Sequence, residues 1–84
     1  MANKPVNLTV YGREGCHLCH AMIEEIREFH AGLELALEII DVDDNEALRL
    51  RYGELVPVLM ADGCEICHYF FDPAAVNAYF GNIR

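Results

Sequence analysis

Two cysteines separated by two residues, Cys16 and Cys19, are the clearest chemical feature of this 84-residue sequence. The pair follows a run typical of a buried strand, residues 8–11, and opens a run with helical periodicity, residues 20–31. A first cysteine at such a junction lies near unpaired backbone N–H groups and the positive end of the helix dipole. Both favour the thiolate, which is the reactive form in disulfide exchange, and the second cysteine can then attack the mixed disulfide. The spacing therefore indicates thiol–disulfide redox chemistry.

A second pair with the same spacing, Cys64 and Cys67, falls within a predicted strand. Three steps along a regular strand span about 10 Å and place the two side chains on opposite faces. A disulfide needs Cα atoms about 4.4–6.8 Å apart. We therefore expect these two cysteines to remain free thiols and to have no role in turnover, unless the strand is bulged.

The four cysteines with His20 or His68 also raise the possibility of a structural zinc site. The long stretch between the two pairs exceeds the usual spacing of zinc ligands, and the predicted fold places the pairs at different strand ends. We therefore expect no bound metal. A module that binds zinc or an iron–sulfur cluster, or a redox-inert interaction module, remains the alternative to an enzyme.

Composition excludes several classes of function. The net charge is −8, from 14 acidic and 6 basic residues, which argues against nucleic-acid binding because that needs a basic surface. No apolar run approaches the ~20 residues that span a bilayer, so we expect no membrane partner. Residues 1–5 lack the pattern of a secretory signal. We expect a monomeric, cytoplasmic protein, in a compartment where thiols are mostly reduced.

The elements expected around Cys16 alternate between strand and helix. Residues 8–11 form the first strand, and residues 35–42 return to a strand composition rich in Leu, Ile and Val. Gly32 is placed to end the helix between them. The apolar residues of that helix recur at the spacing of one buried face: Met22, Ile23, Ile26 and Phe29.

The second half of the sequence predicts a short helix and a hairpin. Residues 43–46 (Asp-Asp-Asn-Glu) supply capping side chains, with Asp43 and Glu46 at capping-box spacing, and the short helix that follows can end at Gly53. Two apolar runs then flank Asp62-Gly63, which is a strong hairpin signal.

Asp72-Pro73 predicts the start of the last helix, as an N-cap followed by proline at the first helical position. Strands linked by helices pair in parallel, and a hairpin adds antiparallel strands. The order therefore predicts one three-layer α/β domain over residues 1–84. Its elements follow the order β-α-β-α-β-β-α, and its four-stranded sheet is mixed.

This order, with Cys16-x-x-Cys19 after the first strand and Val56-Pro57 before the third, resembles the thioredoxin fold. Within that fold the sequence is similar to the small, bacterial-style, dithiol type of glutaredoxin-like protein. The match covers the chain roughly from residue 8 to residue 80. The segments that carry the resemblance are residues 11–19, 40–43 and 52–59.

The resemblance implies a thiol–disulfide oxidoreductase that acts on protein or glutathione mixed disulfides. Cys16 would be the nucleophile and Cys19 the resolving thiol. The bond before Pro57 would be cis, and Val56 would offer backbone groups to a bound peptide or to glutathione. Arg13 would match the basic residue near the family's active-site thiol and, with His17, Val56, Pro57 and Asp72, would belong to the substrate-binding residues. Glutathione would serve as a reductant, and no other cofactor is implied.

The sequence departs from the family pattern at three places. His17-Leu18 replaces the Pro-Tyr common in dithiol glutaredoxins, and Leu55 stands where a threonine usually precedes Val-Pro. Phe70-Phe71 replace the Gly-Gly that usually precedes an acidic residue, here Asp72, that helps hold glutathione. We expect these rings to obstruct the approach of glutathione. The two candidate partners are a disulfide-containing protein and glutathione. His17 either stabilises the Cys16 thiolate when protonated or serves as an exposed spacer.

Overall fold

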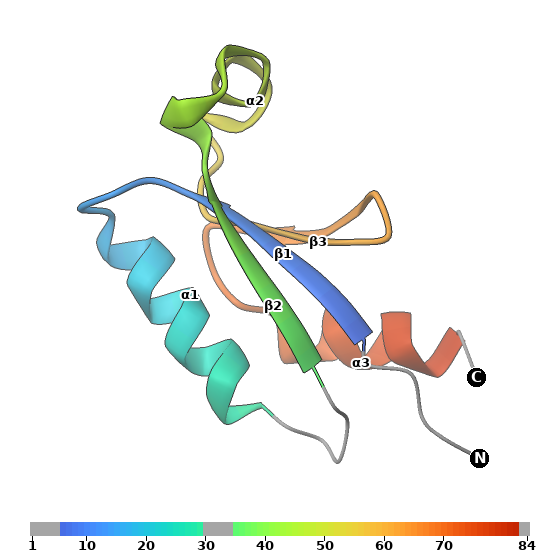
Figure 1. Cartoon of the computed structure of the whole chain (residues 1–84). Coiled ribbons are helices and arrows are strands. Elements are labelled where there is room, and N and C mark those ends of the chain that lie inside the picture. The colour runs from blue at the N-terminus through green and yellow to red at the C-terminus, as the bar shows by residue number, and fades with distance from the viewer. Residues whose placement is uncertain (1–5, 30–34, 83–84) are drawn as a thin grey trace.

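The structure is a computed structural model that describes residues 6–29 and 35–82 (Figure 1). Strands and helices follow each other in the predicted order. They are β1 (Val6–Gly12), α1 (His17–Glu28), β2 (Leu35–Asp41), the 3₁₀ turn η1 (Val42–Asp44), α2 (Glu46–Tyr52), β3 (Val58–Ala61), β4 (Cys64–His68) and α3 (Pro73–Asn82). None of the described helices is long and apolar enough to cross a bilayer.

The four strands form one mixed sheet in the order β2-β1-β3-β4. β1 and β2 are parallel because the helix α1 connects them, whereas β3 pairs antiparallel with both β1 and β4. The two parallel strands finish side by side at one end of the sheet, where the loop to α1 and the helix α2 also lie (Figure 1). Tyr11 pairs with Val58, so the end of β1 lies beside the start of β3.

The protein has three layers, because successive side chains of β3 face opposite sides of the sheet and each side packs against helices. Leu59 and Ala61 face a core that contains residues of both α1 and α3, whereas Val58 and Met60 face a second core with α2. All four of these β3 side chains are buried. In the second core, the Tyr52 ring of α2 stacks on a tyrosine ring of β1, Tyr11, at 4.9 Å. The predicted three-layer fold is confirmed.

The helix boundaries differ from the sequence prediction in two places. α1 begins at His17 and not at residue 20, and its last described turn ends at the C-cap Phe29. The predicted stop at Gly32 lies outside the described residues. The predicted capping box at Asp43 is wrong, because the chain first makes the 3₁₀ turn η1. Asn45 caps α2 instead, and its side chain accepts a hydrogen bond from the Leu48 N–H at 3.1 Å.

β4 contains a bulge, which overturns the expectation of a regular strand. Leu59 pairs with Cys67 while Met60 pairs with Glu65, so one extra residue, Ile66, interrupts the register. Cys64, opposite Ala61, therefore points to the same face as Cys67, not to the opposite one.

A second contact confirms this effect of the bulge. On the other face, Glu65 Oε2 and His68 Nδ1 lie 2.6 Å apart. Such a contact between residues three apart is incompatible with a regular strand, in which their side chains would point to opposite faces.

Candidate active site

Cys16 caps the N-terminus of α1. Its backbone is extended, and its Sγ accepts a hydrogen bond from the Cys19 N–H at 3.2 Å. The turn before it is possible because Gly15 adopts a φ of +79°, a conformation that other residues rarely take. Cys16 thus occupies the position that Ser or Asp usually fills at a helix start, where free N–H groups favour negative charge. The predicted placement of the first sulfur is confirmed, and this sulfur is half-buried.

Cys19 lies one turn further along α1, with only 3% of its surface exposed. Burial, together with the hydrogen bond with Cys16, raises the pKa of this thiol to about 11. The end of β1 approaches the thiol closely. A Cβ at Gly12 would lie 3.3 Å from the Cys19 sulfur. The two cysteines are therefore unequal, because one is accessible and the other is covered and protonated at neutral pH.

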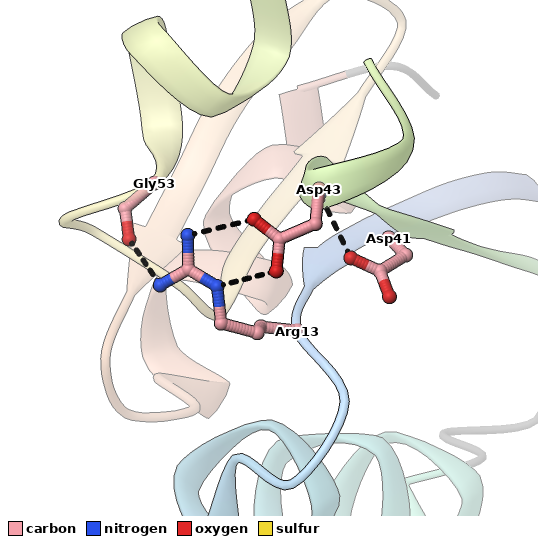
Figure 2. A network of polar contacts seen from close by, with 4 residues as sticks. All are labelled: Arg13, Asp41, Asp43 and Gly53. Carbon is pink, nitrogen blue, oxygen red and sulfur yellow. Dashed lines mark hydrogen bonds and ion pairs between the residues drawn. The ribbon is translucent and has the colours of Figure 1, made fainter. Parts of the chain in front are cut away.

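Arg13 connects three segments of the chain (Figure 2). Its Nε and Nη2 donate to the two carboxylate oxygens of Asp43 at 2.9 and 3.1 Å, and its Nη1 donates to the Gly53 carbonyl at 3.3 Å. The hydrogen bond between the pair raises the pKa of Arg13 and lowers the pKa of the Asp43 carboxyl. Asp41 fixes Asp43 in turn, by accepting a hydrogen bond from its N–H at 2.8 Å.

The backbone of Arg13 contacts both cysteines. Its carbonyl accepts a hydrogen bond from the Cys16 N–H at 3.3 Å, and a backbone hydrogen bond from Arg13 to the Cys19 sulfur lowers the pKa of that thiol. The side chain anchors this backbone to Asp43 and Gly53. The guanidinium that the resemblance assigns to substrate binding is thus engaged within the protein, and its role toward a substrate stays a prediction.

The peptide bond between Val56 and Pro57 is cis, as the resemblance implies. Pro57 is buried and Val56 is half-buried. The pairing of Tyr11 with Val58 brings this segment to the edge of the sheet at which β1 leads into Cys16. The structure therefore gathers the segments around Cys16 and Pro57 at one end of the sheet.

Tyr69 helps to hold the Pro57 segment in place, and the sequence did not point to this role. Its N–H donates to the Pro57 carbonyl at 2.9 Å, and its hydroxyl donates to the Glu54 carbonyl at 3.0 Å. The residue adopts a φ of +67°, which is uncommon for a bulky side chain. No sequence signal marks this conformation. Tyr69 fastens the loop after β4 to the segment that contains Pro57.

The two phenylalanines that follow have different environments. Phe71 packs against Phe29 of the α1 C-cap in an edge-to-face contact at 5.5 Å, so its ring belongs to the core. Phe70 is 68% exposed. The expectation that both rings obstruct glutathione is therefore wrong for Phe71, whose ring is turned inward. Asp72 caps α3, with its carboxylate accepting a hydrogen bond from the Ala75 N–H at 3.2 Å.

The second cysteine pair lies along α3, away from the helix start that holds Cys16. Cys67 accepts a hydrogen bond from the Asp72 backbone, and burial raises the pKa of its thiol. Cys64 lies close enough to Tyr79 to contribute to the raised pKa of that phenol. Cys67 thus lies beside the start of α3 and Cys64 near Tyr79, although the bulge places the two thiols on one face of β4.

A cavity of about 320 Å³ lies beside Cys19, between the β1–α1 loop, α1 and β2. Its apolar wall is formed by isoleucines and its rim is mostly acidic. The lining includes Ile23 and Ile39 on the apolar side, Cys19, and the polar residues Arg13, Glu14, His20, Asp41 and Asp44. In the part of the chain that the structure describes, no three His, Cys, Asp or Glu side chains are arranged to hold a metal ion.

Comparison with known proteins places this site in a family. A family model described as a glutaredoxin-like domain (DUF836) matches residues 7–81. The uncharacterized protein Rv0508 of Mycobacterium tuberculosis is 31% identical over 71 residues, which cover 79% of this chain and 73% of the relative.

Solved structures agree with this assignment. The solution structure of Ne2328 from Nitrosomonas europaea has a TM-score of 0.83 and 46% identity, and covers 94% of this chain and 98% of that one. The X-ray structure of XcR50 from X. campestris has a TM-score of 0.73 and 35% identity, with coverage of 92% and 99%. Thioredoxin 1 from Thermosipho africanus, at 19% identity and a TM-score of 0.59 over 90% of this chain and 96% of its own, shares the fold. The chain therefore belongs to the glutaredoxin-like domain family and has the thioredoxin fold.

Proposed function

We propose that this protein is a cytoplasmic thiol–disulfide oxidoreductase, with Cys16 as the nucleophile and Cys19 as the resolving thiol. One observation carries the proposal. The Cys16 sulfur accepts the Cys19 N–H at a helix start while the Cys19 thiol is buried one turn away. This geometry supports a division of labour, because a substrate disulfide reaches Cys16 first and Cys19 only after the mixed disulfide has formed.

The reaction transfers two electrons from the dithiol to the substrate. The Cys16 thiolate attacks one sulfur of the substrate disulfide, so a mixed disulfide forms and the first substrate thiolate leaves and takes up a proton. Cys19 then loses its proton to solvent and attacks the Cys16 sulfur. The Cys16–Cys19 disulfide forms and the second substrate thiolate leaves. A thiol reductant, either glutathione or a dithiol protein, returns the pair to the reduced state.

The test is reduction of a small chromogenic aromatic disulfide with dithiothreitol as the reductant. We expect Cys16→Ser to abolish turnover, and Cys19→Ser to accumulate the mixed disulfide, which mass spectrometry detects. The double variant Cys64→Ser, Cys67→Ser is the matched control and should keep the wild-type rate. Unchanged turnover in Cys16→Ser would refute the proposal. Zinc or iron that copurifies with the reduced protein and is lost in Cys16→Ser would support the metal-binding alternative instead.

A further inference from the structure

Exposed apolar side chains occur on two of the segments that lead to the candidate site. Among the described residues, five large apolar side chains are exposed. Three of them belong to the start of α1 and to the β4–α3 loop, which is bonded to Pro57. Leu18, between the two cysteines, is 38% exposed, and Tyr69 and Phe70 of the β4–α3 loop are 40% and 68% exposed. We call these three residues the thiol-end surface.

The strand register supports placing these segments at one end of the sheet. Val58 pairs with Tyr11 on one side and with His68 on the other, so the end of β1 and the end of β4 both lie beside the start of β3. β1 leads into the loop before Cys16, and β4 leads directly into Tyr69. The two hydrogen bonds of Tyr69 then hold the β4–α3 loop against the Pro57 segment.

Phe70 is exposed to solvent, as expected for a residue that binds a partner and not for a core residue. Its neighbour Phe71 fills the core, whereas the Phe70 ring faces solvent on a loop that Tyr69 holds in place. Exposing a large aromatic ring to water is unfavourable, and aromatic side chains are enriched where proteins bind partners. The ring can cover apolar residues that flank a disulfide bound at Cys16.

The charges around Cys19 oppose an anionic substrate. The rim of the cavity beside this thiol carries Glu14, Asp41 and Asp44, and its one arginine, Arg13, is neutralised by Asp43. Glutathione has two carboxylates and one ammonium group, so it meets like charges and finds no free guanidinium in this cavity. A net charge of −8 adds a long-range preference for cationic substrates.

We propose that the substrate is a polypeptide disulfide flanked by apolar and basic residues, which docks on the thiol-end surface. This inference rests on the proposed oxidoreductase function and names its substrate class. The apolar flank contacts Phe70 and Leu18, and the basic flank approaches the acidic rim beside Cys19. The polypeptide disulfide is the oxidant and takes up the two electrons of the Cys16–Cys19 dithiol.

The experiment compares three disulfide peptides and oxidised glutathione on the full chain, with dithiothreitol as the reductant. The three peptides share one length and differ in the residues beside the disulfide. The first carries Lys and Phe there, the second carries Ala, and the third carries Glu and Ser. We expect kcat/KM for the Lys/Phe peptide to exceed those for the Glu/Ser peptide and for oxidised glutathione by about tenfold at low salt. This preference should shrink as ionic strength rises.

A matched pair of variants tests the docking surface. Phe70→Ala should lower the ratio of kcat/KM for the Lys/Phe peptide to kcat/KM for the small aromatic disulfide about fivefold. Leu50→Ala removes another exposed apolar side chain, on α2, and should leave that ratio at the wild-type value. Equal ratios in the two variants, or oxidised glutathione as the best substrate, would overturn the substrate inference. Absence of turnover with the small disulfide would instead refute the oxidoreductase function itself.

Discussion

Arg13 and Asp43 are joined by two hydrogen bonds, of 2.9 and 3.1 Å, although they stand thirty residues apart in the sequence. The pair fastens the loop that precedes Cys16 to the turn that follows β2 (Figure 2). Through the third bond, from Arg13 to the Gly53 carbonyl, the same side chain also contacts the end of α2, four residues before Pro57. The two segments that meet at the candidate site are thus tied to one guanidinium.

Asp43→Asn should lower turnover more than it lowers stability. The amide loses the ion pair, so the Arg13 backbone that contacts both cysteines is held less firmly. The two side chains are 38% and 45% exposed, and exposed ion pairs contribute little to folding. We expect kcat to fall several-fold on the small aromatic disulfide while the urea midpoint changes little. Asp43→Glu should restore part of the loss.

Glu46→Gln is the matched control for this prediction. It breaks the exposed ion pair with Arg49, which has an N···O distance of 3.7 Å and lies within α2, so it does not join α2 to the loop before Cys16. We expect no change in kcat. A similar loss in both variants would show that the Arg13–Asp43 pair acts only through the general charge of the protein.

The raised pKa of Cys19 predicts a loss of stability in alkaline solution. The folded state holds this pKa at about 11, above the unfolded value near 9. The neutral thiol is therefore favoured by folding, and its contribution is fully present below about pH 9 and is lost as the pH rises through 11. Urea midpoints of the reduced protein between pH 8 and pH 11 should fall more steeply for wild type than for Cys19→Ala. Parallel pH profiles would contradict the buried, protonated state of Cys19.

Gly12→Ala should slow the second half of the reaction. The new Cβ would lie 3.3 Å from the Cys19 sulfur and 3.5 Å from its Cβ, so the side chain must shift by a few tenths of an ångström. Resolution of the mixed disulfide requires the Cys19 sulfur to reach the Cys16 sulfur in line, whereas the first attack does not involve Cys19. We expect the mixed disulfide to accumulate in rapid-quench samples analysed by mass spectrometry. Accumulation no greater than in wild type would show that Cys19 has room to adjust.

The sequence predicts the features that depend on neighbouring residues. The helix start at the first cysteine follows from the strand-like run before it and the helical periodicity after it, and the cap at Asp72 follows from the adjacent proline. The failed cap at Asp43 has a non-local cause. Its carboxylate binds Arg13, thirty residues earlier, and Asp43 itself lies within the 3₁₀ turn η1, so Asn45 caps α2 instead.

Two other differences arise from backbone geometry that side-chain patterns do not encode. The extra residue in β4, Ile66, is an ordinary strand residue, so its type gives no sign of the bulge. The positive φ of Tyr69 redirects the chain after β4, and Phe70 then faces solvent while Phe71 enters the core. A sequence pattern treats these two rings alike, and only the fold separates them.

Cys64 and Cys67 should remain free thiols when Cys16 and Cys19 are oxidised, although the bulge places them on one face. The Asp72 backbone holds Cys67 beside the start of α3 while Cys64 lies near Tyr79, so we expect the two sulfurs to stay apart. Their reactivities should differ, because Cys64 is exposed whereas Cys67 is half-buried with a pKa raised by burial.

Mass spectrometry of the mildly oxidised protein tests both statements. We expect two alkylated cysteines per chain, with Cys64 modified several times faster than Cys67 at pH 8 because the thiolate is the reactive form. In the unfolded protein the two rates should converge, since the difference in burial is lost. A bridge between Cys64 and Cys67 would show that the bulged strand opens enough to bring its two ends together, and would make this pair a second redox centre.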